Sequence, residues 1–165
     1  MRAVEHSDTQ EVAYAKALRD RTAALMNADA DRIALTGGAS ELLGQLPGLL
    51  QPRTGSTIVA VATDFPAVTR PWLRFAAEHD CTVRFVEDDP AVDLTDALIQ
   101  AVDNETGAVA VSFVQYGTGT RIDVPKLRQR TAALGVPLIV DATQAAGLLQ
   151  VDSTDWGADA VVASG

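Results

Sequence analysis

Short apolar runs alternate with longer amphipathic segments along most of this chain, and this alternation limits the folds open to it. The runs have the length of strands, and the segments between them are long enough to hold a helix. The runs are Ile33 to Leu35, Thr57 to Ala62, Cys81 to Val86, Ala108 to Phe113, Pro137 to Asp141 and Ala160 to Ala163. Strands joined by helical crossovers build a parallel sheet covered on both faces. The sequence therefore predicts an α/β fold with a doubly wound, mainly parallel sheet in three α/β/α layers.

Helix signals agree with this pattern. An amphipathic helix is predicted before the first strand, from about Glu11 to Asn27. Farther along, Asp123 is placed to cap a helix, Pro125 to lie in its first turn, and Gly135 to end it. No repeat and no long Pro/Gly/Ser linker divides the chain, so residues 1–165 are expected to form one unit.

Composition excludes several classes of partner. The net charge of -9 argues against nucleic acid, which needs a basic face. No stretch approaches the ~20 apolar residues of a membrane span, and the polar first residues predict a cytoplasmic protein. The single cysteine, Cys81, excludes an internal disulfide. The histidines His6 and His79 are far apart in sequence, so we predict no metal site.

The segment after the first predicted strand can hold a phosphate. Gly37 and Gly38 allow a tight turn, and Ser40 opens an apolar helix. The amides and the positive dipole end of a helix N-terminus favour an anion, and the Ser40 hydroxyl adds a donor. The alternative is a simple glycine turn with an N-cap serine.

Asp141 ends an apolar strand, where burial of its charge is costly unless a cation meets it. A protonated pyridine nitrogen is such a cation. Gln144 can donate to a phenolate oxygen on the same ring, and Phe65 offers a flat face for stacking. The alternatives are an ordinary capping turn at Asp141-Ala142-Thr143 and a core position for Phe65.

From Arg32 to Gly165 these residues resemble the class V aminotransferase family of fold-type I pyridoxal phosphate enzymes, which includes cysteine desulfurases and kynureninase. The most specific stretches are Val140-Asp141-Ala142-Thr143-Gln144-Ala145-Ala146-Gly147 and Trp156-Gly157-Ala158-Asp159-Ala160-Val161-Val162-Ala163-Ser164-Gly165. The resemblance implies pyridoxal 5′-phosphate as cofactor and an amino acid as substrate. The chemistry implied is transamination or C–S or C–C lyase chemistry.

The resemblance also implies a set of cofactor contacts. The phosphate is expected at Gly38, Ala39, Ser40 and Ser164, and the ring at Phe65, Asp141 and Gln144. Phe65-Pro66 and Val114-Gln115-Tyr116 resemble kynureninase-like members, whereas desulfurases tend to carry a histidine at Phe65. Tyr116 stands where many relatives have asparagine, and its role stays open.

The family's Schiff-base lysine follows the Ser-Gly pair after one further residue, which places it beyond Gly165. No catalytic residue is therefore expected within residues 1–165, because Lys16 and Lys126 fall on helices away from the site. The family's small C-terminal domain is also missing from the sequence. We expect an incomplete cofactor-binding (large) domain that pairs as a homodimer or with a complementing C-terminal chain.

Two other functions compete with this interpretation. One is a non-catalytic fragment or subunit that binds the cofactor weakly or only packs against a partner chain. The other is an NAD(P)-dependent short-chain dehydrogenase, with Asp64 as the ribose-binding acid. Glu41 sits where that family's loop needs glycine, and the sequence has no Tyr-x-x-x-Lys pair.

Overall fold

The computed structural model describes residues 2–164, with side chains from residue 10 onward, and it alternates helices with strands. The helices are α1 (Arg2–Met26), the 3-10 helix η1 (Ala30–Arg32), α2 (Ala39–Leu50), α3 (Pro66–Glu78), α4 (Leu94–Ala101), α5 (Val124–Ala133) and α6 (Ser153–Trp156). The strands are β1 (Thr57–Val61), β2 (Thr82–Val86), β3 (Thr106–Ser112), β4 (Leu138–Asp141) and β5 (Ala160–Val162).

The strands form one parallel sheet in the order β2-β1-β3-β4-β5, as the alternation predicted. The chain passes from β1 out to β2 and then crosses back over β1 to reach β3. The direction in which strands are added therefore reverses between β1 and β3. Parallel sheets of this kind bind ligands at the carboxyl ends of the strands beside such a reversal. A site is therefore expected at the carboxyl ends of the strands, which we call the carboxyl edge of the sheet.

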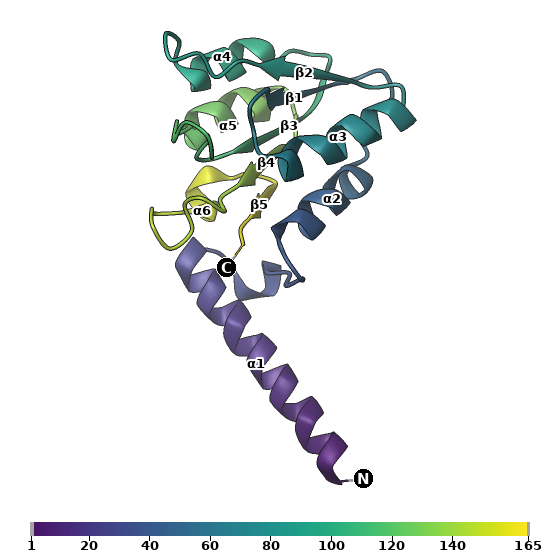
Figure 1. Cartoon of the computed structure of the whole chain (residues 1–165), viewed down its shortest axis with the longest axis vertical. Coiled ribbons are helices and arrows are strands. Elements are labelled where there is room, and N and C mark those ends of the chain that lie inside the picture. The colour runs from purple at the N-terminus through teal and green to yellow at the C-terminus, as the bar shows by residue number, and fades with distance from the viewer. Residues whose placement is uncertain (1, 165) are drawn as a thin grey trace.

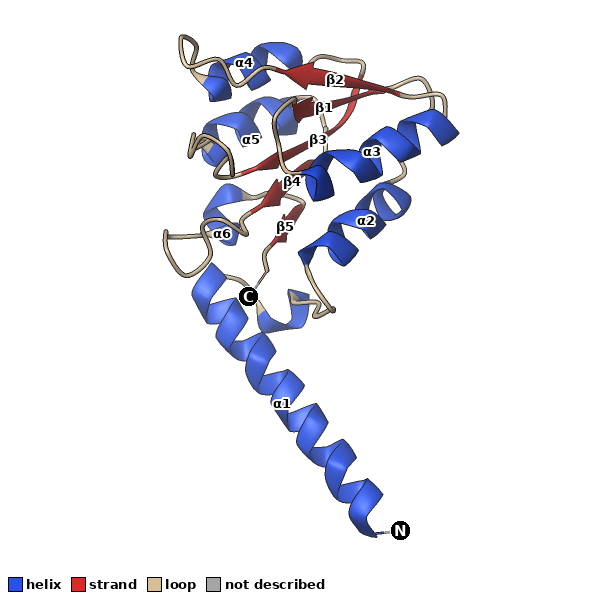
Figure 2. Cartoon of the chain, viewed as in Figure 1, coloured by secondary structure: helices blue, strands red, loops and turns tan. Residues whose placement is uncertain are grey.

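Helices cover both faces of the sheet, so the predicted three layers are confirmed. Figure 2 shows α2 and α3 on one face and α4, α5 and α6 on the other. Successive strand residues point to opposite faces. Ile58 packs with Trp72 on the α2–α3 face, whereas its neighbour Val59 packs with Leu98 and Leu127 on the other.

No strand forms at residues 33–35, where the sequence predicted one, so the sheet has five strands within residues 2–164. Ile33 caps the end of η1 and is half-buried, and Ala34 and Leu35 are exposed. Strands in parallel sheets are covered on both faces. Because Ala34 and Leu35 remain exposed, this run lacks the cover that a strand of a parallel sheet has.

Helix α1 begins earlier than the predicted Glu11, at Arg2, and Figure 1 shows it projecting away from the sheet. Among residues 10–26 of this helix, the buried side chains are Ala23 and Met26 at its C-terminal end, while Tyr14 is 78% exposed. The end at Met26 agrees with the prediction to within one residue. Among the described residues, no helix is long and apolar enough to cross a membrane.

The predicted signals around α5 are confirmed. The Asp123 side chain accepts a hydrogen bond from the backbone N–H of Lys126 at 3.0 Å, and Pro125 lies in the first turn. Gly135 follows the helix with a φ of 66°, a left-handed conformation that favours glycine.

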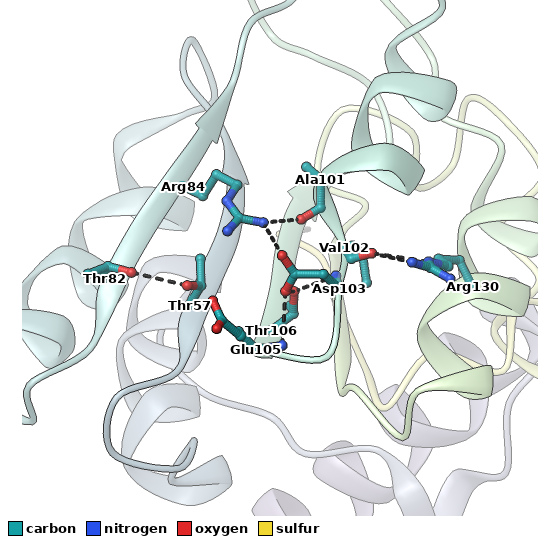
Figure 3. Close-up of polar contacts among 9 residues, drawn as sticks. All are labelled: Thr57, Thr82, Arg84, Ala101, Val102, Asp103, Glu105, Thr106 and Arg130. Atoms are coloured by element: carbon teal, nitrogen blue, oxygen red, sulfur yellow. Dashed lines mark hydrogen bonds and ion pairs between the residues drawn. The ribbon is translucent and has the colours of Figure 1, made fainter.

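A polar network at the amino end of β3, which we call the amino edge of the sheet, reaches Arg84 in the middle of the outer strand β2 (Figure 3). Arg84 on β2 donates to the Asp103 carboxylate at 2.7 Å and to the Ala101 carbonyl at 2.6 Å. Asp103 also accepts from the Thr106 hydroxyl at 3.1 Å and from the Glu105 N–H at 3.0 Å. The Arg84 guanidinium, through this hydrogen bond, holds the pKa of Asp103 below its ordinary value. The charges of Arg84 and Asp103 therefore compensate each other.

Two contacts complete the amino edge of the sheet. Arg130 on α5 donates to the carbonyl of Val102, the residue that caps α4, at 2.7 Å and 3.1 Å (Figure 3). Gly107 on β3 lies so close to the preceding loop that an added Cβ would be 2.2 Å from Ser56 Oγ and 3.0 Å from Pro52 Cβ. This edge is closely packed.

Candidate functional site

Asp141 is the last residue of β4 and lies at the carboxyl edge of the sheet, as predicted. Its side chain is buried, with 6% of the residue exposed, and it accepts a hydrogen bond from the Thr143 N–H at 2.9 Å. The capping turn and the buried charge are thus both present. Burial raises the pKa of Asp141, the hydrogen bonds from Thr143 oppose this, and the charge of Asp64 raises it further. No salt bridge to Asp141 forms within the described part of the chain.

Asp64, in the turn after β1, is a second buried carboxylate at this edge. It accepts from the Ser112 N–H at 2.7 Å, the Ser112 hydroxyl at 2.5 Å, the Gln115 amide at 3.3 Å and the Phe65 N–H at 2.7 Å. Ser112 is paired in register with Asp141, so it lies between the two acids. Ser112 was not predicted from the sequence, and Asp64 was considered only as the ribose-binding acid of the dehydrogenase alternative. The rule applied to Asp141, an acid at the end of an apolar strand, would have found Asp64.

The protein's own hydrogen bonds at Asp64 disfavour the dehydrogenase alternative. A ribose-binding acid must leave its oxygens free for the sugar hydroxyls. Both Asp64 oxygens already accept hydrogen bonds, from Ser112, Gln115 and Phe65.

Gln115 lies just beyond β3 and carries an orphaned polar atom. The residue is 2% exposed, and its Nε2 donates to Asp64 and to the Ser112 carbonyl. Its Oε1 is the one buried side-chain polar atom among the described residues that has no hydrogen-bond partner. Buried polar atoms in native proteins are nearly always paired. An unmet acceptor beside two buried acids fits a site that is completed by a bound group.

Phe65 is the N-cap of α3 and is 45% exposed, which excludes the core position considered for it. Its ring meets the ring of Tyr116 edge to face, with centroids 5.3 Å apart. Tyr116 is 52% exposed and belongs to the loop after β3. Exposed aromatic faces at a ligand edge can stack on a flat ring.

Helix α2 begins where the sequence predicted an anion-binding helix N-terminus. The N-cap is Gly38, so the alternative with Ser40 as N-cap is wrong. The first turn begins at Ala39, and the first amides of a helix have no partner within it. Glu41 stabilises the turn by accepting from the Gly37 N–H at 3.0 Å. Ser40 is exposed and available as a further donor.

The structure brings the predicted site residues together in two groups. Ser40 and Phe65 line one open hollow of about 470 Å³, to which Arg70 and Arg74 also contribute. The Ser164 N–H donates to the Thr143 hydroxyl at 3.2 Å, which brings Ser164 to the turn after Asp141. Gln144 is exposed in that same turn.

Together these residues fit a ligand that has an anionic group and a cationic aromatic ring. The α2 N-terminus suits the anion, the buried acid Asp141 suits the cation, and Phe65 suits a ring face. Neither lysine contributes to this set. Lys16 pairs with Asp20 on α1 at 2.8 Å, and Lys126 on α5 pairs with Asp96 at 2.6 Å.

Comparison with known proteins agrees with this geometry. A "Probable cysteine desulfurase" of Methanothermobacter thermautotrophicus is 32% identical over 86% of this chain and 35% of its own length. A kynureninase of Burkholderia mallei is 31% identical over 91% of this chain and 36% of its own length. The chain thus spans little more than a third of the curated relatives it matches.

A solved structure of C-DES, in which glycine is linked to the PLP cofactor, shares the fold. It superposes with a TM-score of 0.82 at 20% identity and covers 95% of this chain and 43% of C-DES. The family model described as aminotransferase class-V matches residues 1–165. The chain therefore belongs to the class V aminotransferase family.

Proposed function

We propose that this chain forms the pyridoxal phosphate-binding part of a class V aminotransferase-like enzyme that acts on an amino acid. One observation carries the proposal: Asp141 is buried at the carboxyl edge of the sheet, burial and the charge of Asp64 raise its pKa, and it forms no salt bridge within the described residues. A protonated pyridine nitrogen would supply the missing positive charge. Family membership and the PLP-containing fold relative support this choice of cofactor.

Each predicted residue has a distinct task in this proposal. Asp141 accepts the ring N–H and keeps the ring protonated, and Gln144 donates to the ring hydroxyl. Phe65 stacks on one ring face. The amides at Gly38 and Ala39 and the hydroxyl of Ser40 bind the phosphate, joined by Ser164. Bound pyridoxal phosphate supplies an electron sink for the negative charge that develops at the substrate α-carbon.

The reaction is proposed only as a class. Transamination and C–S or C–C bond cleavage all begin with bond breaking at the α-carbon, and they differ in groups beyond the residues placed here. The lysine that holds the cofactor covalently is proposed to lie outside residues 1–165, because neither Lys16 nor Lys126 is among the residues of the candidate site.

Assembly and location are likewise part of the proposal. A homodimer, or a pairing with a complementing C-terminal chain, would complete the site, and the cytoplasm is the proposed compartment. Binding without catalysis is the second candidate, and it is favoured for residues 1–165 by themselves because neither lysine is among the residues of the candidate site.

The test is binding of pyridoxamine 5′-phosphate, which has the ring and phosphate of the cofactor but no aldehyde to react with surface lysines. Asp141→Ala should weaken binding by about 30-fold or more, since it removes one partner of a buried charge pair. Asp155→Ala is the matched control, because Asp155 is exposed on α6 and should leave affinity unchanged. Equal losses from both variants would show that Asp141 does not meet the ring.

A covalent test separates binding from catalysis. Residues 1–165 mixed with pyridoxal phosphate and reduced with borohydride should give no stoichiometric adduct in peptide mapping. A stoichiometric adduct on Lys16 or Lys126 would overturn the site as described. Addition of a complementing C-terminal chain should restore adduct formation and, with an amino-acid substrate, turnover.

A further inference from the structure

Asp64 has more hydrogen-bond partners than any other acid at the carboxyl edge of the sheet, yet the proposed function gives it no task. Its carboxylate accepts hydrogen bonds from Phe65, Ser112 and Gln115, and the residue is 5% exposed. Hydrogen bonds to a charged acceptor are stronger than those between neutral groups. This cluster is therefore a firm local structure.

These donors come from two different parts of the chain. Phe65 belongs to the turn between β1 and α3, whereas Ser112 ends β3 and Gln115 begins the loop after it. Asp64 thus connects the turn after β1 to the loop after β3, at the place where the direction of strand addition reverses. The edge-to-face contact of Phe65 with Tyr116 joins the same two segments at the exposed surface.

The position of Phe65 depends on these ties. Phe65 has no side-chain cap of its own at the start of α3, and nearly half of its surface is exposed. Its backbone N–H is held by Asp64 at 2.7 Å, and its ring is held by Tyr116. An exposed ring held at both points is oriented before a ligand arrives, which reduces the entropy lost on binding.

We infer that Asp64 is a positioning residue for the cofactor: it fixes the backbone of Phe65 and, with the β3 loop, orients that ring to stack on the cofactor ring. This inference rests on the proposed function. The competing account gives Asp64 a structural role alone, as a tie between β1 and β3. The two accounts differ in whether the effect of Asp64 on ligand binding passes through Phe65.

A double-mutant cycle in the purified chain tests this, with the dissociation constant of pyridoxamine 5′-phosphate as the readout. The variants are Asp64→Asn, Phe65→Leu and their combination. Each single variant should weaken binding by about tenfold, and Asp64→Asn should cost almost nothing further once Phe65 is leucine, because coupled residues are not additive. Asp88→Asn is the matched control, since Asp88 also bonds the β3 loop, at Thr118, but does not touch Phe65. It should leave binding unchanged.

Each outcome decides the inference. Loss of affinity in Asp64→Asn that disappears in the Phe65→Leu background supports it. Equal losses in both backgrounds, or an Asp64→Asn variant that binds like Asp88→Asn, overturn it. The proposed function stays intact in that case if Asp141→Ala still weakens binding as expected. A wild-type chain that does not bind the ligand overturns both. If Asp64→Asn does not fold, Ser112→Ala replaces it under the same criteria, because it removes one donor and keeps the carboxylate.

Discussion

Each edge of the sheet carries an acid, but among the described residues the acid at the amino edge is paired with a cation and the acid at the carboxyl edge is not. At the amino edge, Arg84 meets Asp103, and the pKa of that acid is lowered. At the carboxyl edge, Asp141 is buried near Asp64 without a salt bridge in the described residues, and its pKa is raised. At the amino edge the acid is paired with a cation of the protein. At the carboxyl edge the acid Asp141 is available to pair with a cationic ligand. Changes at the first should therefore alter stability alone, and changes at the second should alter binding.

The largest effect on stability is expected from Gly107→Ala at the amino edge. The new Cβ would lie 2.2 Å from Ser56 Oγ, so the backbone or that side chain must move. Overpacking of this kind costs about 1–3 kcal/mol in the free energy of unfolding. Thermal melting measures the loss. Gly48→Ala is the control, because nothing lies within 4 Å of its added Cβ and alanine favours the helix.

Ligand affinity sharpens this test. The folded Gly107→Ala protein should bind pyridoxamine 5′-phosphate like the wild type below its melting temperature. A loss of affinity at full folding would show that the two edges are not independent.

A smaller effect is expected from Asp141→Asn in the ligand-free chain, which should gain about 1 kcal/mol of stability at neutral pH by losing an uncompensated buried charge. The pKa of Asp141 is higher in the folded chain than its ordinary value of 3.8. The folded state therefore holds its proton longer than the unfolded state, and wild-type stability falls as pH rises from about 3.8 through the folded pKa.

Melting curves over a range of pH check the sign of this effect. The advantage of Asp141→Asn over wild type should grow from acid to neutral pH and then stay constant. An advantage that shrinks as pH rises would mean that Asp141 already has a cationic partner in the protein.

The smallest effect is expected from Arg84→Met. The Arg84–Asp103 pair is part-exposed on both sides, and such pairs contribute little to stability. The melting temperature should fall by about 1–2 °C, and the difference should shrink at high salt, where exposed charges are screened. Lys16→Met, in an exposed pair on α1, should give no measurable change. A larger loss of ligand affinity than of stability in Arg84→Met would contradict the division between the edges.

The sequence predicted most of the sheet because parallel strands buried on both faces stand out as continuous apolar runs. Thr57 to Ala62 and Pro137 to Asp141 each match a strand to within one residue. The failure at Ile33 to Leu35 has the same basis, because a short apolar run does not show whether anything will cover it. The projection of α1 was not predictable either, since its spacing indicates a helix but not its packing partner.

The candidate site was predictable where a residue's own chemistry conflicts with its surroundings. Asp141 was found because an acid at the end of a buried strand needs a cation. Asp64 met the same condition and was considered only as a ribose ligand, because its partners Ser112 and Gln115 are distant in sequence. Those contacts arise from the strand order, which places β3 next to β1.

The central claim is that the carboxyl edge keeps a negative charge at Asp141 for a protonated ring nitrogen. The most direct measurement is the ¹⁵N chemical shift of ring-labelled pyridoxamine 5′-phosphate bound to the chain, followed as pH rises. In the wild type, the ring nitrogen should remain protonated past the pH at which the free ligand loses its ring proton. In Asp141→Asn, the bound ligand should lose that proton at or below the pH of the free ligand. Identical titration of the ring nitrogen in the two proteins would contradict the account.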